Sequence, residues 1–137
     1  MIRRPRAFAV LLVLAVLTLA GARPAAAGAS AAVAAPRALT PAEQAWVAHA
    51  QRVDRDGWIH LRIAGGPRER GFQHGYLLAK EIDASLRTTR RRWEYKTGME
   101  WPWLVRKSEA MFRGRVDAEI LAELAGLAAG LAAAGVP

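Results

Sequence analysis

The sequence contains no cysteine, so the 137-residue chain forms no disulfide, no thiolate metal site and no cysteine nucleophile of its own. Histidine is also scarce. His49, His60 and His74 are not spaced as a metal-binding motif, and we interpret each as exposed or packed on its own element. We therefore assign no catalytic, cofactor-binding or metal-binding residue in this chain, and we expect no cofactor.

Large hydrophobic side chains are fewer than the 53% hydrophobic content implies. Thirty residues are alanine, and 11 of them lie among the 19 residues from 20 to 38, where no side chain is large enough to build a core. The length allows one small domain at most. Residues 28–38 are predicted to be an Ala/Pro-rich linker, which leaves residues 39–137 as the folded part.

The N-terminus has the three parts of a secretory signal peptide. Three arginines within the first six residues precede an apolar run over residues 7–20, and small residues follow up to Ala27. The apolar run is shorter than the roughly 20 residues that span a bilayer. We expect residues 1–27 to be removed on export to the periplasm or the extracellular space. An uncleaved membrane anchor is the alternative, and both Sec and twin-arginine export stay open.

The net charge of +8 is partly a feature of this export signal. Residues 1–34 hold four of the 20 basic residues and none of the 12 acidic ones, so the remainder carries +4. This lower charge weakens an interpretation as a nucleic-acid-binding protein. A basic cluster lies beside Trp93 and Tyr95, at Arg87, Arg90, Arg91, Arg92 and Lys96. Because three acidic residues lie close by, we interpret this cluster as a solvated helix face.

The folded part is predicted to begin with a helix and a strand. Thr40 and Glu43 form a capping box around Pro41, and apolar residues at helical spacing extend the predicted helix through Val53. Alternating apolar residues then predict a half-buried strand over Trp58–Ala64. No second strand pattern is evident, and an isolated strand leaves its backbone groups unpaired. We therefore expect the rest of the sheet to lie beyond residue 137.

A long helix is predicted from Pro67 to Gly98, with Gly71 and Gly75 one turn apart. Each glycine costs about 1 kcal/mol relative to alanine inside a helix. We expect this cost to be offset by the close approach of another backbone, either the preceding strand or a neighbouring helix. The charged and polar residues around the two glycines exclude a membrane-embedded glycine-motif dimer.

Two further helices are predicted after Gly98. Trp101 opens the first, and Asp117 caps the second, whose apolar stripe is formed by Ile120, Leu124, Leu127 and Leu131. We interpret Trp101 and Trp103 as core anchors, with the lip of a lipid or ligand site as the alternative. The expected fold class is a helix-rich α+β fragment with one strand and about four helices.

Two segments carry a resemblance to a known family. Residues 57–78 contain GWIHL and then GGPRERGFQHGYLL, a short strand, a turn with proline and a helix with glycines four apart. Residues 120–131 read ILAELAGLAAGL. Both segments, in this order, resemble the N-terminal part of the N-terminal-nucleophile acyltransferases and hydrolases related to isopenicillin-N acyltransferase and of phospholipase B-like proteins.

The resemblance implies an αββα fold, in which two stacked antiparallel sheets are flanked by helices. It also implies a cysteine that is exposed by self-cleavage and attacks amide or ester bonds, with its own α-amino group as the base. Because this chain has no cysteine, no catalytic residue is carried over to it. The implied partners are the remainder of the catalytic domain and a small-molecule or lipid substrate, without nucleic acid.

We therefore expect an exported N-terminal portion of a self-processing amidase, acyltransferase or phospholipase B-like hydrolase that is inactive alone. The alternative is a complete, small, exported helical protein that binds a partner or the envelope surface and has no catalytic activity. The basic cluster and the nearby tryptophans motivate this second hypothesis.

The export signal generates the first testable prediction. Mass spectrometry of the exported protein should find a new N-terminus between Gly28 and Pro36, because small residues precede these positions. Intact Met1 retained in the membrane fraction would instead identify an uncleaved anchor.

Overall fold

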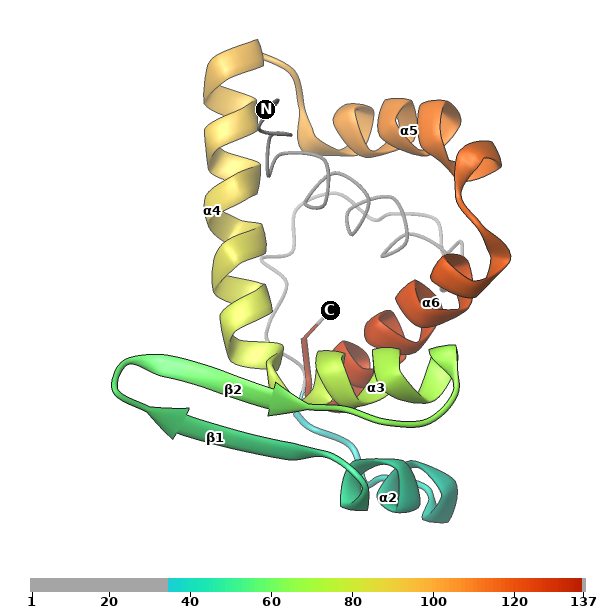
Figure 1. The fold of residues 1–137 in the computed structure, drawn as a ribbon. Coiled ribbons are helices and arrows are strands. Elements are labelled where there is room, and N and C mark those ends of the chain that lie inside the picture. The colour runs from blue at the N-terminus through green and yellow to red at the C-terminus, as the bar shows by residue number, and fades with distance from the viewer. Residues whose placement is uncertain (1–34, 137) are drawn as a thin grey trace, which may run out of the picture.

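The structure is a computed structural model, and it describes residues 35–136. The predicted signal peptide and its cleavage sites lie outside these residues. The described elements are α2 (Pro41–Ala48), β1 (Gln51–Arg55), β2 (Trp58–Arg62), α3 (Pro67–Leu77), α4 (Ala79–Thr97), α5 (Trp101–Phe112), the 3-10 helix η1 (Arg113–Arg115) and α6 (Ala118–Ala133). Helices α3, α4, α5 and α6 form the four sides of a frame, with the hairpin and α2 beneath α3 (Figure 1). The predicted helix-rich α+β class is confirmed.

The contact between α3 and α6 is made directly by the two backbones, because glycines lie where the helices meet. A methyl carbon on Gly75 would lie 2.9 Å from the carbonyl carbon of Leu127, and one on Gly71 would lie 2.9 Å from the backbone nitrogen of Leu127. Both positions are nearer still to a carbonyl oxygen of α6. No side chain larger than hydrogen fits at either glycine without moving the backbone of α6.

The glycines of α6 approach α3 in the same way. A methyl carbon on Gly126 would lie 3.0 Å from the backbone nitrogen of Phe72, and one on Gly130 would lie 2.7 Å from that of Tyr76. The predicted close approach of another backbone is therefore confirmed, and the neighbour is a helix about 50 residues further along the chain.

Buried hydrophobic side chains gather around this crossing. Phe72 of α3 is 1% exposed and Leu131 of α6 is fully enclosed, and Leu124 and Leu127 are also buried. Ile120, which was predicted on the same stripe, is 45% exposed. It lies about one turn before Glu123, whose backbone faces Gly71 of α3.

Gln73 fastens two other elements to α3. Its amide oxygen accepts a hydrogen bond from the backbone N–H of Ala64 at 2.9 Å. Its amide nitrogen donates to the carbonyl oxygens of Ala64 at 2.9 Å and of Trp46 at 2.7 Å. The side chain is fully buried and fully satisfied, so it holds the end of β2 and the last turn of α2 against α3.

Helix α2 begins at the predicted capping box. Thr40 and Glu43 exchange the two capping hydrogen bonds, and Arg37 donates to both carboxylate oxygens of Glu43, at 2.6 and 2.8 Å. The guanidinium of Arg37 and the donors of Thr40 outweigh burial and lower the pKa of Glu43 to about 2. The backbone N–H of Arg37 also donates to the carbonyl oxygen of Ala133, which joins this segment to the end of α6.

The prediction of one unpaired strand is wrong. Helix α2 ends at Ala48, and residues Gln51–Arg55 form β1, which pairs antiparallel with β2 from Gln51 opposite Arg62 to Arg55 opposite Trp58. The two-residue turn at Asp56 and Gly57 has positive φ at both positions, 53° and 78°. Asp-Gly favours this hairpin turn. The prediction that the rest of the sheet lies beyond residue 137 was based on an unpaired strand. Because β2 is paired with β1, the structure no longer supports that argument.

The single long helix predicted from Pro67 to Gly98 is two helices, α3 and α4, separated at Leu78. In a continuous helix the carbonyl oxygen of Leu77 would accept from the N–H of Glu81. Here it accepts from the guanidinium of Arg52 at 2.6 Å, and Arg52 also binds the carboxylate of Glu81 at 2.7 Å. The arginine of β1 thus caps the end of α3 and fixes the start of α4.

The strand predicted to be half-buried over Trp58–Ala64 ends at Arg62, and four of its five residues are exposed. The boundaries predicted at Gly98, Trp101, Gly114 and Asp117 agree with the structure. Gly98 ends α4 in the left-handed conformation, with φ 66°. Trp101 begins α5, Asp117 is the N-cap residue of α6 without a side-chain hydrogen bond, and Gly114 lies in η1 between these helices.

The glycine contact predicts the effect of adding one methyl group. Gly75→Ala gains up to about 1 kcal/mol of helix propensity. It also forces two backbones apart, and overpacking costs about 1–3 kcal/mol or more. We expect a net loss of stability, visible as a melting temperature lowered by several degrees in the full chain. Gly126→Ala should behave in the same way.

Gly114→Ala is the matched control, because a methyl group there meets no atom within 4 Å. It should leave the melting temperature unchanged or raise it slightly. A raised melting temperature for Gly75→Ala would contradict the close packing of α3 and α6.

The lowered pKa of Glu43 predicts a contribution to the free energy of unfolding that is lost in acid. Its carboxyl group titrates near 4.5 when unfolded and near 2 in the folded protein. Because the folded pKa is the lower one, the contribution is fully present above pH 4.5 and is lost as the pH falls toward 2. Melting temperatures measured over this range should fall less steeply for Glu43→Gln than for the unmodified chain. Glu100→Gln is the control, since the exposed Glu100 has no ion pair with another described residue; equal slopes for all three proteins would contradict the assignment.

Candidate functional site

The three histidines lie on separate elements of the structure. His49 is the exposed C-cap residue of α2, and His60 is exposed on β2. Within residues 35–136 no three His, Cys, Asp or Glu side chains are placed to hold a metal ion. These positions agree with the interpretation of both histidines as structural or exposed residues.

His74 is half-buried on α3. Burial lowers the pKa of its imidazole, and the carboxylate of Glu123 on α6 partly opposes this effect. Glu123 is itself paired with Arg70, at 3.1 Å, and Arg70 also binds Glu119 at 2.9 Å. His74 is therefore a helix-packed side chain at the edge of an ion-pair cluster that joins α3 to α6.

The basic cluster on α4 is a partly paired, solvent-facing surface. Arg87 pairs with Asp83 and Arg90 pairs with Glu94, both one turn apart on the helix. Tyr95 is 91% exposed, and none of the α4 residues is fully buried. The described structure thus agrees with a solvated face over most of α4.

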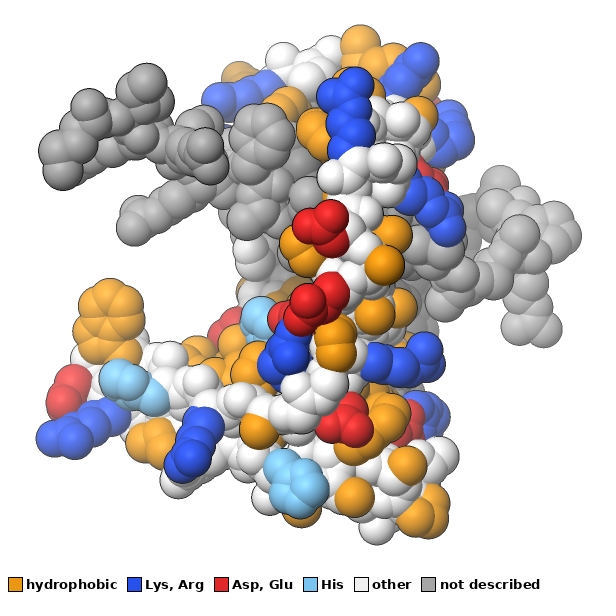
Figure 2. All heavy atoms as spheres, turned by 45° about the vertical axis from the view of Figure 1, so that its right-hand side comes forward, with side chains coloured by type: hydrophobic (Ala, Val, Ile, Leu, Met, Phe, Trp, Pro, Cys, Tyr) orange, Lys and Arg blue, Asp and Glu red, His pale blue; other side chains and the backbone are white. Residues whose placement is uncertain are grey.

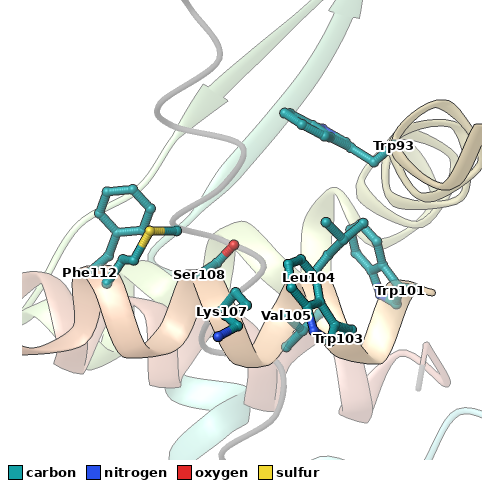
Figure 3. A pocket seen from close by; sticks show the side chains of 9 residues that line it. Trp93, Trp101, Trp103, Leu104, Val105, Lys107, Ser108 and Phe112 are labelled. Atoms are coloured by element: carbon teal, nitrogen blue, oxygen red, sulfur yellow. The ribbon is translucent and has the colours of Figure 1, made fainter. Parts of the chain in front are cut away.

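A cavity lies at the corner between α4 and α5. Its volume is about 310 Å³. The lining side chains come from the end of α4 and the length of α5, and they are Trp93, Trp101, Trp103, Leu104, Val105, Lys107, Ser108, Met111 and Phe112. Figure 3 shows the α5 side chains in a row along the helix, with Trp93 reaching toward them from α4.

Glu94 fixes the turn that builds this corner. Its carboxylate accepts from the backbone N–H of Trp101 at 3.2 Å and from Arg90 at 3.0 Å. Together with the left-handed Gly98, this contact turns the chain between α4 and α5 so that Trp93 and Trp101 line one cavity. Two features of the sequence could therefore predict this corner: Gly98, which ends α4, and the helical spacing of the apolar residues of α5.

The interpretation of Trp101 and Trp103 as core anchors needs correction. Trp101 is half-buried and Trp103 is 37% exposed, and both line the cavity rather than the main core. The main core lies at the crossing of α3 and α6, on the other side of the frame from the α4–α5 corner (Figure 1). The alternative interpretation, a ligand or lipid lip, is the one that their positions favour.

Lys107 was not singled out in the sequence, yet it is the one charged side chain among the described residues that line the cavity. Its ammonium nitrogen lies 5.5 Å from the centroid of the Trp103 ring, one helical turn away, at a distance typical of a cation–π contact. Ser108 is buried in the same lining. The cavity can therefore enclose an apolar group and offers one positive charge.

Comparisons with known proteins give no match: neither a family model, nor a curated protein, nor a solved structure matches this chain. None of the helices over residues 35–136 is both long enough and apolar enough to cross a membrane.

Proposed function

We propose that this chain is the exported N-terminal portion of a self-processing amidase, acyltransferase or phospholipase B-like hydrolase. In this proposal the chain acts on no substrate by itself. The remainder of the catalytic domain supplies the catalytic sheets and the cysteine nucleophile, and a small-molecule or lipid substrate binds to the assembled enzyme. The bonds that it cleaves are amides or esters, and the enzyme works outside the cytoplasm.

The observation that carries the proposal is the crossing of α3 and α6. The two segments that resemble the family are about 50 residues apart, and their glycines face each other: Gly71 and Gly75 against the backbone of α6, Gly126 and Gly130 against that of α3. Two motifs that pack as one unit support each other far more than two separate matches. Together the two segments form a tight helix pair. In this proposal the pair holds α4 and α5 where a further part of the catalytic domain can contact them.

The exposed apolar faces of α4 and α5 support the same proposal. The stripe of α4 contains Ile82, Leu86 and Trp93, and all three are only half-buried in the described structure. An amphipathic helix gains most of its stability by burying such a stripe against other elements. We infer that a further part of a catalytic domain covers these two helices.

The proposal is tested on the complete gene. The reading frame should continue past codon 137 and encode a cysteine after strand-forming segments. The purified product should consist of two fragments, the second beginning with this cysteine, and replacement of the cysteine should leave one uncut chain. The 137-residue chain alone should hydrolyse neither amide nor ester test substrates.

The glycine crossing provides a sharper variant within the same test. Gly75→Leu should prevent α3 from meeting α6 and should leave the full-length protein as an uncut precursor, whereas Gly114→Leu should mature normally because its surroundings are open. Gel electrophoresis and N-terminal sequencing report both outcomes. A reading frame without a downstream cysteine, or normal maturation of Gly75→Leu, would contradict the proposal.

A second candidate function is a small exported binding protein without catalytic activity. The cavity between α4 and α5 favours it, because a binding function needs only this site. In that case the 137-residue chain should unfold cooperatively and bind its ligand alone. A broad transition with strong binding of a hydrophobic dye would count against this second function.

A further inference from the structure

The lining of the α4–α5 cavity specifies the chemistry of a ligand. Eight of its nine described lining residues are uncharged, and three of these are tryptophans. Its volume of about 310 Å³ is at the lower end of the range for small-molecule sites. With so few polar groups the cavity cannot satisfy the hydrogen bonds of a sugar or a nucleobase. A single alkyl chain fits both the volume and the apolar lining.

The charges around the cavity specify the other end of the ligand. Residues 87–115, which contain the cavity, hold nine basic and three acidic residues, a net charge of +6. The rest of the described chain, residues 35–86 and 116–136, holds seven basic and nine acidic residues, a net charge of −2. Positive charge is therefore concentrated on the second half of α4, on α5 and on η1, the segment that contains the cavity. Basic and hydrophobic side chains lie side by side over the upper part of the molecule (Figure 2).

The basic side chains at the corner are only partly neutralised. Of its three acidic residues, Glu94 pairs with Arg90 and Glu109 pairs with Arg113. Lys107 has no ion pair with another described residue, and its contact with the Trp103 ring leaves the ammonium group able to donate. A negatively charged group at the edge of the cavity would therefore meet an available cation beside an aromatic wall.

We propose that the α4–α5 cavity binds a long-chain carboxylate, with the alkyl chain among the tryptophans and the carboxylate at Lys107. The two parts of the ligand correspond to the two properties of the corner, an apolar cavity and a concentration of positive charge. The inference concerns the 137-residue chain itself. Its test is separate from that of the proposed hydrolase function, in which a further part of the protein covers the same two helices.

The test is a titration of the full 137-residue chain with sodium dodecanoate below its micelle concentration, followed by calorimetry and by tryptophan fluorescence. Dodecyltrimethylammonium is the matched ligand, because it has the same chain and the opposite charge. We expect saturable binding of dodecanoate with a change in fluorescence, and binding of the cationic ligand that is at least about tenfold weaker.

Two variants test the named residues. Lys107→Glu should weaken dodecanoate binding by about tenfold or more and reduce the preference over the cationic ligand. Lys80→Glu makes the same charge change at an exposed position of α4 outside the cavity and should leave both affinities nearly unchanged. Ser108→Leu should reduce the binding of both ligands by filling the cavity, and circular dichroism would show that it remains folded.

Several results would overturn the inference. These are the absence of saturable dodecanoate binding, equal affinity for the two ligands, or equal effects of Lys107→Glu and Lys80→Glu. Co-sedimentation with phosphatidylglycerol vesicles, unaffected by Ser108→Leu and without dodecanoate binding, would assign the corner to a membrane surface instead. A dimer in analytical ultracentrifugation that dodecanoate does not dissociate would assign the cavity to a second copy. None of these results would affect the test for self-cleavage of the longer protein.

Discussion

The rest of the structure depends on the backbone contact between α3 and α6. Four glycines allow it, and each lies where a single methyl group would collide with the opposite helix. Helix α3 then serves as the attachment point for everything before it: Gln73 holds α2 and the end of β2, and Arg52 holds the hairpin to the end of α3. Helix α6 is in turn joined to the segment before α2 through Arg37 and Ala133. These links join α2, the hairpin and the segment before α2 to the two helices of the crossing.

The sequence was informative where the cause of a structure is local. The capping box of α2, the stop at Gly98 and the glycine spacing on α3 are all read from a few neighbouring residues, and all three agree with the structure. The sequence did not predict which helix packs against Gly71 and Gly75, because glycine spacing indicates only that another backbone segment approaches closely. The small-residue pattern of α6 was the available signal for the partner.

The two fold predictions that were wrong have distinct physical reasons. Val53 continues the helical spacing of apolar residues from α2, and Asp56-Gly57 is compatible with both a helix end and a hairpin turn. The sequence pattern therefore did not distinguish β1 from a continuation of the helix. The break at Leu78 has a long-range cause, since Arg52 reaches the carbonyl oxygen of Leu77 from 25 residues earlier. The cavity was only partly predictable for the same reason: the apolar face of α5 was evident, but its meeting with Trp93 depends on how Glu94 turns the chain.

Buried contacts are unevenly distributed over the frame: the α3–α6 side has many and the α4–α5 side has few. Most of the buried hydrophobic side chains belong to α3 and α6, whereas α4 buries none completely and α5 is connected to it mainly through Glu94 and the cavity lining. Elements with few buried contacts open at a lower free-energy cost than the core. The α4–α5 corner can therefore adjust to a ligand, or to a covering part of a larger domain, without disturbing the crossing that specifies the fold. The proposed ligand site and the contact that specifies the fold are therefore separate parts of the structure, and a substitution at the corner leaves the packing of α3 against α6 unchanged.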